Sequence, residues 1–420
     1  MAPMKVLISG AGITGNALAF WLSKLGHNVT VVERFPGLRT TGLQVDLRGP
    51  GVKVLKRMGL EEAFRAKAVP EQGLLVVDSA NRRRASFGVN TSGKGLQNFT
   101  TEYEIMRGDL CRVIHDAIQD KVTFRFGVSI DSFKQGGNGV DVEFTDGKSE
   151  RFDFVVGADG IGSNTRKLML GPGVKDGLCP IKGAYMAYFT IPRPIQTGEG
   201  YNCTFYLATG RRAIMTRRHS PEEIQVYLSC NTLSERMTKA HKDGVPEQKK
   251  ALAEIFRDAG WQSKDILRDM FNSDNFYCER LGLVKLDAWY DGSVVLVGDA
   301  AYCPSPLTGM GTTSGLVGAY VLAGEISRHC GKANGGKAPT DGLDMAFKAY
   351  DDKFRPFINQ VTDGVGDDSI FWNMMPSSAF AVGLVNLVLG IAAFLRLNVL
   401  GRWILKEGVK WTLPEYDELM

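Results

Sequence analysis

The chain has few of the residues on which metal, disulfide and nucleic-acid proteins depend. Its 420 residues include seven cysteines, none in C-x-x-C spacing, and five histidines, none paired at metal-ligand spacing. We therefore expect no metal site and no disulfide framework, but reduced thiols in a cytoplasmic protein. The formal net charge is only +4 and no long Lys/Arg block occurs, which argues against a nucleic-acid partner.

Long uncharged stretches are also rare. Residues 369–395 carry no charged side chain, and residues 379–395 are nearly all apolar. These 17 residues are at the lower end of what spans a bilayer, and Asn386 interrupts them. We therefore expect a helix buried between two domains. The alternative is a membrane-associated protein, held through residues 379–395.

The first 33 residues predict a strand–helix–strand unit that binds a dinucleotide. Residues 6–8 and 29–32 are short apolar runs typical of buried strands, and residues 14–25 predict a helix. A G-x-G-x-x-G motif lies between the first strand and the helix, formed by Gly10, Gly12 and Gly15. Gly10 permits a tight turn, Gly12 permits close approach of a pyrophosphate, and Gly15 permits close packing of the helix on the strand.

Glu33 ends the second predicted strand, and Arg34, placed with it in the cofactor site, opens the next loop. A carboxylate at this strand end can accept hydrogen bonds from both hydroxyls of an adenosine ribose. It would repel a 2′-phosphate, which favours FAD or NAD as the bound dinucleotide over NADPH. A signal peptide explains the segment less well, because it needs neither spaced glycines nor a second strand ending in an acid, and we expect no targeting segment.

Two residues between this unit and the later motifs are further candidates. Asp46 lies on a short strand or loop close in sequence to the unit, where it is either a cofactor contact or a solvated surface acid. Arg107 stands just before a helix predicted by the apolar spacing up to residue 118. A guanidinium at that place can pair with a phosphate or a ribose.

Two later segments repeat the pattern of a buried strand followed by glycine and aspartate. The first leads from residue 153 into a glycine-rich turn with Asp159, and Ser163 can cap the helix that follows. The second leads from residue 292 into Gly298 and Asp299, and then into an apolar helix that extends to residue 326. Backbone N–H groups at the start of that helix predict a site for negative charge. The candidate residues there are Pro306, Gly309, Gly311 and Thr312.

Residues 180–286 differ from the rest of the chain in their sequence pattern. Alternating, aromatic-rich runs predict strands, with one helix over about 246–259, and residues 73–90 predict a hairpin. This is the pattern of an antiparallel sheet inserted into the nucleotide-binding domain. Four side chains on these strands are candidates for substrate contact, although structural roles are more common for such residues. They are Tyr188, Tyr206, Arg217 and Tyr227.

Together, the three motifs resemble those of the class A FAD-dependent monooxygenases. This para-hydroxybenzoate hydroxylase-like family includes tetracycline-modifying enzymes and fungal secondary-metabolite hydroxylases. The order and spacing match over residues 1 to about 330. Tyr302 departs from the family pattern, which often has histidine there, and Thr313 stands where asparagine is common. Neither change removes a backbone donor, so FAD binding is still expected.

The resemblance implies an α/β fold with a Rossmann-like FAD-binding domain of the GR2 type, an inserted antiparallel-sheet substrate domain and a C-terminal helical segment. The FAD-binding domain would comprise residues 1–72, 98–179 and 287–365. The substrate domain would comprise residues 73–97 and 180–286, and the C-terminal segment residues 366–420.

The resemblance also implies roles for individual residues. Asp299 would bind the ribityl chain, and Asp159 would be shared between FAD and NADPH. Asp46 would lie near the flavin edge. The remaining roles are Glu33 at the adenosine ribose, Gly10, Gly12 and Gly15 at the pyrophosphate, Arg107 at the ribityl–pyrophosphate region, and Gly311 and Thr312 beside the isoalloxazine.

The activity implied is hydroxylation of a small hydrophobic, aromatic or polyketide-like molecule in secondary metabolism. FAD would be bound, NADPH or NADH would bind transiently, and O2 would react to form a flavin C4a-hydroperoxide. Epoxidation and Baeyer–Villiger oxidation are the alternatives. An NAD-dependent dehydrogenase leaves Gly298 and Asp299 unexplained, and a membrane-bound binding protein is the weakest explanation. The sequence identifies no catalytic base and does not distinguish a monomer from a dimer.

Overall fold

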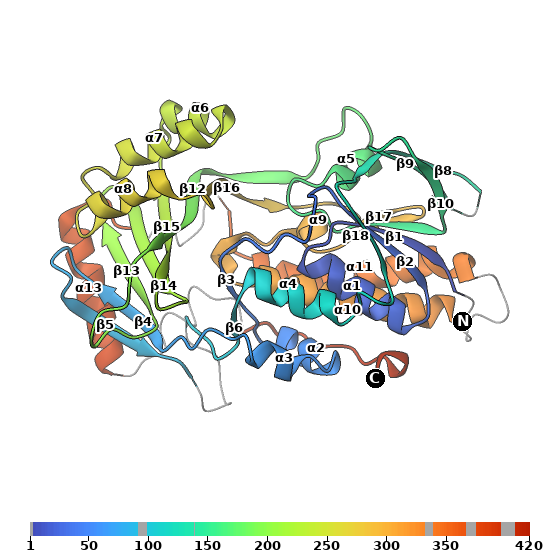
Figure 1. The fold of residues 1–420 in the computed structure, drawn as a ribbon, viewed down its shortest axis with the longest axis horizontal. Helices are drawn as coiled ribbons and strands as arrows, with labels where there is room; N and C mark the ends of the chain where they lie inside the picture. Colours follow the sequence, from blue (N-terminus) through green and yellow to red (C-terminus); the bar gives the residue numbers. More distant parts are fainter. Residues whose placement is uncertain (1–2, 91–98, 138, 332–338, 367–374, 396–407) are drawn as a thin grey trace.

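The computed structural model describes residues 3–90, 99–137, 139–331, 339–366, 375–395 and 408–420. Figure 1 shows two parts, each built on a sheet, with the long strands β12 (Leu178–Pro192) and β16 (Tyr277–Val284) extending from one part to the other. The mixed α/β architecture predicted from the sequence is confirmed.

The first part contains a six-stranded sheet in the order β17-β18-β11-β1-β2-β7, in which only the edge strand β17 is antiparallel. Side chains alternate between its two faces, so Val6 and Ile8 join one apolar cluster and Leu7 another. The strand bounds are β1 (Lys5–Ser9), β2 (Asn28–Glu33), β7 (Thr123–Phe126), β11 (Phe154–Gly157), β17 (Tyr290–Asp291) and β18 (Val294–Leu296).

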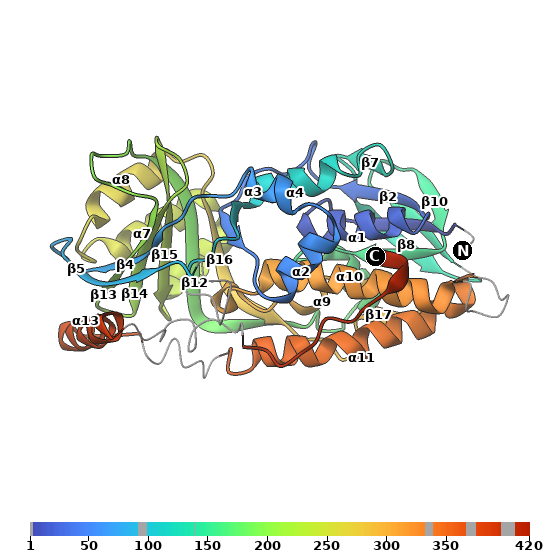
Figure 2. The same ribbon diagram turned by 90° about the horizontal axis from the view of Figure 1, so that it is seen from below.

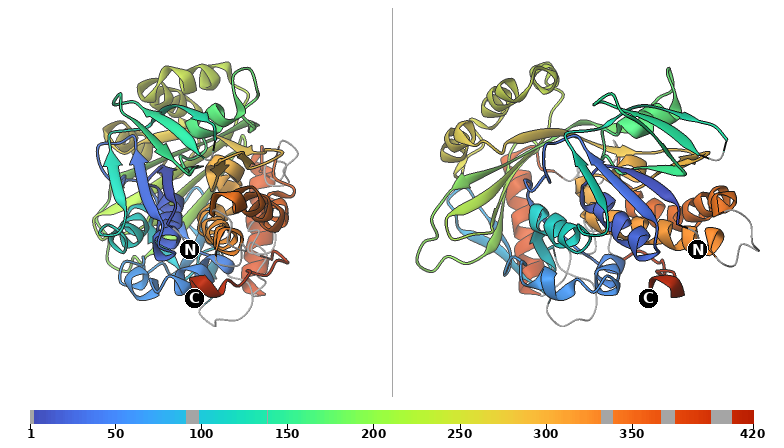
Figure 3. Two further views of the ribbon diagram at one scale, coloured as in Figure 1. Left: turned by 90° about the vertical axis from the view of Figure 1, so that its right-hand side faces the viewer. Right: turned by 45° about the vertical axis from the view of Figure 1, so that its right-hand side comes forward.

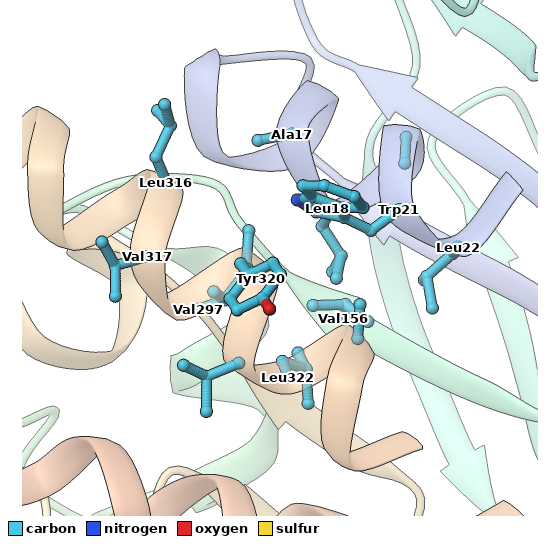
Figure 4. Close-up of a cluster of buried hydrophobic side chains, with 14 of the residues drawn as sticks. Ala17, Leu18, Trp21, Leu22, Val156, Val297, Leu316, Val317, Tyr320 and Leu322 are labelled. Carbon is cyan, nitrogen blue, oxygen red and sulfur yellow. The ribbon is translucent and has the colours of Figure 1, made fainter. Parts of the chain in front are cut away.

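Helices cover one face of this sheet. Helix α1 (Ile13–Lys24) packs against α10 (Gly311–Cys330), and Figure 4 shows Trp21 of α1 close to Tyr320 of α10. The centres of these two rings are 5.3 Å apart. The other helices of this part are α2 (Pro50–Arg57), α3 (Glu61–Arg65), α4 (Arg107–Asp116), α5 (Asn164–Leu170), α9 (Asp299–Tyr302) and α11 (Leu343–Thr362), with short 3-10 turns at Pro306–Thr308, Pro339–Gly342 and Asp417–Leu419.

A three-stranded antiparallel sheet covers the other face. It consists of β8 (Ile130–Gln135), β9 (Val140–Phe144) and β10 (Ser149–Phe152), and Figure 1 shows it above β1 and β2. Its Val140 and Val142 share an apolar cluster with Leu7 of β1. The parallel sheet is therefore buried on both faces, which is why its strands read as continuous apolar runs.

The second part contains a seven-stranded sheet in the order β16-β12-β15-β14-β13-β4-β5. It is antiparallel except for the pairing of β13 with β4, which is parallel. The hairpin predicted over residues 73–90 forms β4 and β5 and joins this sheet, as expected. The strand bounds are β4 (Gly73–Val77), β5 (Arg83–Gly88), β13 (Asn202–Ala208), β14 (Arg212–Arg218) and β15 (Glu223–Asn231).

Three helices cover one face of the seven-stranded sheet, so the expectation of a single helix was wrong. They are α6 (Glu235–Asp243), α7 (Val245–Phe256) and α8 (Ser263–Asn272), and Figure 1 shows them together on one side of β12–β15. Helix α6 escaped prediction because it is polar and buries only Met237 and Ala240. The apolar side chains beneath the helices form a second core.

The C-terminal helix α13 (Ala379–Phe394) lies on the outside of the seven-stranded sheet, away from α10 and α11 (Figures 2 and 3). It packs against β5 and β13, and only Leu389 and Ala392 are buried. Phe380 and Phe394 are 82% and 86% exposed. The expectation of a helix buried between two domains was therefore wrong. None of the described helices is long and apolar enough to cross a membrane.

Candidate cofactor and substrate site

The turn between β1 and α1 depends on its glycines. Gly10 has φ +109°, and a Cβ there would lie 2.6 Å from the carbonyl oxygen of Ala158. A Cβ on Gly15 would lie 1.9 Å from the carbonyl oxygen of Gly10, so only glycine allows this close packing. Gly12 is the N-cap residue of α1, and no side chain caps the helix. The N–H groups of its first turn can therefore serve an anion.

Glu33 stands at the carboxyl end of β2, beside that turn. Its Oε2 accepts a hydrogen bond from the Ala11 N–H at 3.0 Å, and its Oε1 accepts one from the Phe35 N–H at 3.1 Å. The two bonds fix the carboxylate next to the glycine turn while leaving it further acceptor capacity. The guanidinium of Arg34 lies over the Phe35 ring, 5.1 Å from its centre.

Arg107 faces the glycine turn from the first residue of α4. Its Nη2 lies 3.7 Å from the position that a Cβ on Gly12 would occupy, and its Nη1 donates to the Thr41 carbonyl oxygen at 3.3 Å. The positive charge thus stands opposite the N-terminus of α1. Two sources of positive potential converge on the same space, as a pyrophosphate requires.

The second motif forms a closed turn at the end of β11. Asp159 accepts hydrogen bonds from the Thr165 N–H and hydroxyl, both at 3.0 Å, and from the Ser163 hydroxyl. Ser163 caps α5 by accepting from the Arg166 N–H at 2.9 Å, as predicted. Arg166 is fully buried and donates to the Ala300 carbonyl oxygen at 3.0 Å. The motif thus ties β11 to the start of the third motif, and a cofactor contact of Asp159 stays a prediction.

Thr14, which the sequence reading overlooked, brings the first and third motifs together. A Cβ on Gly298 would lie 2.7 Å from the Thr14 hydroxyl oxygen, and one on Gly315 would lie 2.3 Å from it. Gly298 also has φ +68°. The first turn of α1 therefore packs directly against α9 and α10. The signal for this contact was a glycine at both places, where any larger residue would meet Thr14.

Asp299 is the first residue of α9, and its side chain is accessible to solvent although protein atoms lie on most sides of it. This burial raises the pKa of the Asp299 carboxyl group above its ordinary value. The charge of Arg107 and a hydrogen bond from the Cys303 thiol act against burial and lower the pKa of Asp299. The carboxylate is thus accessible and lies within the field of the same arginine that faces the glycine turn.

The start of α10 is held by the loop that follows β3 (Gln44–Asp46). The Thr313 hydroxyl accepts from the Arg48 N–H at 3.0 Å, and the Arg48 Nε donates to Asp46 at 2.5 Å. Asp46 therefore belongs to a loop that touches the first turn of α10. No side chain caps this helix, whose first residues are Gly311 and Thr312. Pro306 and Gly309 (φ +64°) shape the 3-10 turn before it.

Tyr302 and Thr313, the two departures from the family pattern, are both buried. The Tyr302 hydroxyl accepts from Tyr350 at 3.2 Å, and its ring centre is 4.6 Å from that of Trp289. The tyrosine is therefore part of the aromatic core, and Thr313 holds the Arg48 backbone.

Two of the candidate substrate residues, Tyr188 and Tyr227, face the first part from the seven-stranded sheet. They share an apolar cluster with Leu43, which precedes β3. Tyr188 stacks on Tyr277 with ring centres 4.6 Å apart, and Tyr227 meets Tyr188 edge-on at 5.6 Å. These side chains form one aromatic surface, which we call the tyrosine face (Tyr188, Tyr227 and Tyr277).

Arg217 lies in a buried polar cluster that joins the two parts. Its Nε and Nη2 donate to Glu71 at 2.9 Å each, and its Nη2 also lies 2.9 Å from Glu104 of β6 (Glu104–Met106). Gln44 donates to both carboxyl groups, at 2.6 and 3.2 Å. Burial and the neighbouring Glu71 raise the pKa of Glu104 to about 8, against the opposing charge of Arg217. The guanidinium is thus occupied by protein, and substrate contact stays a prediction.

Tyr206, the remaining candidate for substrate contact, lies apart from Tyr188, Tyr227 and Arg217. Its hydroxyl donates to the Ala259 carbonyl oxygen at 2.7 Å, and its ring belongs to the core beneath α7 and α8. It also lines an open hollow of about 880 Å³ between α13 and the β4–β5 hairpin. Because neighbouring residues of a strand face opposite sides of the sheet, aromatic content alone did not distinguish Tyr206 from Tyr188.

Glu279 of β16 was missed from the sequence and lies on the tyrosine face. Its Oε1 accepts a hydrogen bond from the Tyr188 hydroxyl, and the residue is half-buried. The pKa of Glu279 is raised to about 7, mainly by burial; the Tyr188 hydrogen bond lowers it and the charge of Asp299 contributes to the rise. A lone glutamate on an alternating strand carries little signal, since most such residues are solvated.

Comparison with known proteins agrees with this geometry. A sequence model of the FAD binding domain family matches residues 3–365, and the chain belongs to that family. Within it, the protein is a class A FAD-dependent monooxygenase, a flavoprotein oxidoreductase. It is 48% identical to the FAD-dependent monooxygenase asL4 of Sarocladium schorii, over 100% of both chains. It is 41% identical to the flavin-dependent monooxygenase eupH of a Phoma species, over 94% of this chain and 93% of that protein.

A solved structure shows the same architecture. The tetracycline destructase Tet(55) is 28% identical and superposes with a TM-score of 0.76, over 99% of each chain. The expected family and fold class are thereby confirmed.

Proposed function

We propose that this enzyme uses NADPH or NADH and O2 to hydroxylate a small aromatic or polyketide-like molecule of secondary metabolism. One observation carries the proposal: complementary groups gather between the glycine turn and the tyrosine face. Glu33 and Arg107 border the turn at the N-terminus of α1. The charge of Arg107 also acts on Asp299 and on Tyr277 of the tyrosine face. Glu33, Arg107 and Asp299 each match one part of FAD.

The residues present fit the cofactor. Glu33 would hold the adenosine ribose, while Gly10, Gly12, Gly15 and Arg107 would hold the pyrophosphate. Asp299 would accept hydrogen bonds from ribityl hydroxyls, because solvent reaches it and no described cation pairs with it directly. Arg34, Asp46, Asp159, Gly298, Pro306 and Gly309 would border the same site. Bound FAD would supply the chemistry, accepting a hydride from the nicotinamide and passing one oxygen atom of O2 to the substrate.

The protein contributes charge and exclusion of water. The uncapped N-terminus of α10 offers its positive end, with Gly311 and Thr312, to negative charge on the bound cofactor. The tyrosine face would cover the bound cofactor with aromatic rings that bind an aromatic substrate and exclude water. We assign residues 73–97 and 180–286 to a substrate domain for this reason, and the support is that β4 and β5 complete its sheet.

The proposal is tested with the purified protein and ¹⁸O2. We expect a flavin absorbance spectrum, oxidation of NADPH or NADH that a panel of phenolic and polyketide compounds stimulates, and a product carrying one labelled oxygen. Oxygen inserted next to a carbonyl group or across a double bond would contradict hydroxylation and favour a Baeyer–Villiger or epoxidation activity. Stimulated oxidation of NADPH with H2O2 as the only product would contradict both.

A further inference from the structure

Glu279 differs from the other carboxyl groups near the site in what surrounds it. It lies opposite Met186 of β12 and two residues from Tyr277, so it shares the tyrosine face. Tyr188 donates to its Oε1, and no other described residue is hydrogen-bonded to this carboxyl group. It is only half-buried, so solvent or a ligand reaches it. The second oxygen is therefore available to a donor on a bound molecule.

The groups that face Glu279 come from three sides. Tyr188 faces it from β12, with Tyr227 of β15 edge-on against Tyr188, and Tyr277 lies on its own strand. Asp299 and Cys303 act on it from α9 and the residue that follows. Arg107 and Arg39 act on Tyr277 beside it. With Asp299 as the neighbouring charge, the carboxyl group titrates near neutral pH, at a pKa of about 7. This suits a proton acceptor at physiological pH.

We propose that Glu279 accepts the proton of a substrate hydroxyl group and is the base of this reaction. The inference rests on the hydroxylation proposed above. In the step, the O–H bond of the phenol breaks, the proton moves to the free oxygen of Glu279, and the electron pair remains on the substrate oxygen. The ortho and para carbons become more electron-rich, as transfer of an electrophilic oxygen atom requires. The half-buried carboxyl group then returns its proton to solvent.

Tyr188 is a positioning residue in this arrangement. Its own pKa lies well above the ordinary value for tyrosine because of burial and the nearby Glu279, so it remains a donor at neutral pH. By donating to one carboxyl oxygen it holds the group in place and leaves the other oxygen without a hydrogen bond to any described residue. It also lowers the pKa of Glu279, which keeps more of that group ionised.

The test is the Glu279→Gln variant, which preserves shape and the Tyr188 contact. Its matched control is Glu223→Gln, an exposed glutamate of the same sheet on β15. For a weakly acidic phenol, we expect kcat/KM of E279Q to fall roughly 100-fold or more at neutral pH, with flavin content unchanged. The loss should shrink for increasingly acidic phenols and at high pH, since these ionise without a base. A constant loss across the series would overturn the inference.

Two further measurements keep the result independent of turnover. A difference spectrum of bound p-nitrophenol should show more of the anion with wild type than with E279Q at a pH below the pKa of the free phenol. Tyr188→Phe, which loses the hydrogen bond that lowers the pKa of Glu279, should shift the acidic limb of the kcat/KM profile to higher pH. If E279Q loses its flavin, or if Y188F leaves the limb in place, the carboxyl group does not act as the acceptor.

The outcomes also separate this inference from the proposed function. Wild-type protein that hydroxylates phenols, with E279Q matching it at every pH, would overturn the role of Glu279 alone. Wild-type protein that hydroxylates no compound of the panel would overturn the proposed function. Hydroxylation confined to substrates without an acidic hydroxyl group would also overturn the role of Glu279, because such substrates have no proton for it to accept.

Discussion

Two clusters of carboxyl groups flank the proposed site, and both contain a glutamate whose pKa is raised by burial. In one, Glu71 and Glu104 share Arg217, and Gln44 donates to both of them. In the other, Glu279 has a single tyrosine donor, and solvent reaches both it and Asp299. The first is saturated by protein and the second is not. The difference shows that a shifted pKa alone does not identify a reactive group, whereas unused, accessible acceptor capacity does.

The largest effect should come from breaking the saturated cluster. Arg217→Met leaves Glu71 and Glu104 buried without their cation, and breaking such a pair costs about 3–5 kcal/mol in the free energy of unfolding. Urea unfolding followed by circular dichroism measures it. The control is Arg83→Met on the exposed face of β5, where we expect less than about 0.5 kcal/mol. Similar small losses for both variants would show that Arg217 does not stabilise the cluster.

A smaller effect on folding, but a large one on the cofactor, is expected in the accessible cluster. Asp299→Ala should yield protein largely without flavin, because each hydrogen bond to a charged acceptor contributes about 1.5–3 kcal/mol. Flavin absorbance relative to protein absorbance after purification measures occupancy. Asp120→Ala, at an exposed turn, serves as the control and should keep its flavin. Full occupancy in Asp299→Ala would remove this residue from the cofactor site.

The effect that is smallest per pH unit concerns the pH dependence of stability. The pKa of Glu104 is raised to about 8, so the folded protein retains a proton that the unfolded chain releases above its ordinary pKa. The contribution of this group therefore falls as the pH rises from about 5 to 8, with a slope of at most about 1.4 kcal/mol per pH unit. Glu104→Gln should fold normally and flatten that slope in urea titrations. An unchanged slope would assign the proton to another group.

The N-terminal unit was predictable because several independent signals coincide there. The spacing of apolar residues, the spacing of the glycines and the place of Glu33 all depend on local geometry. As a result, β1, α1 and β2 begin and end within about two residues of the prediction. Ser163 was predictable as a cap for the same reason. The second part was less predictable, since α6 is polar and buries only Met237 and Ala240.

Two features of the site could not be read from the sequence because they depend on distant partners. The buried environment of Arg217 requires Glu71 and Glu104, which belong to segments more than a hundred residues earlier. The donor of Glu279 is Tyr188, 91 residues away. Helix α13 shows the same limit. Its apolar composition predicts that the helix packs against another part of the protein, but it does not predict which part. A Cβ on its Gly390 would lie 2.9 Å from the Arg84 carbonyl oxygen on β5.

The parallel pairing of β4 with β13 has a consequence for biosynthesis. The β4–β5 hairpin leaves the ribosome early, whereas β13, β14 and β15 follow only after most of the six-stranded sheet has been made. The hairpin must therefore wait with Val76 and its neighbours uncovered, and its edge strand is open to mispairing with other nascent chains. Slow translation should prolong this interval. Inclusion-body formation, rather than loss of activity in the folded enzyme, is then the expected failure of production.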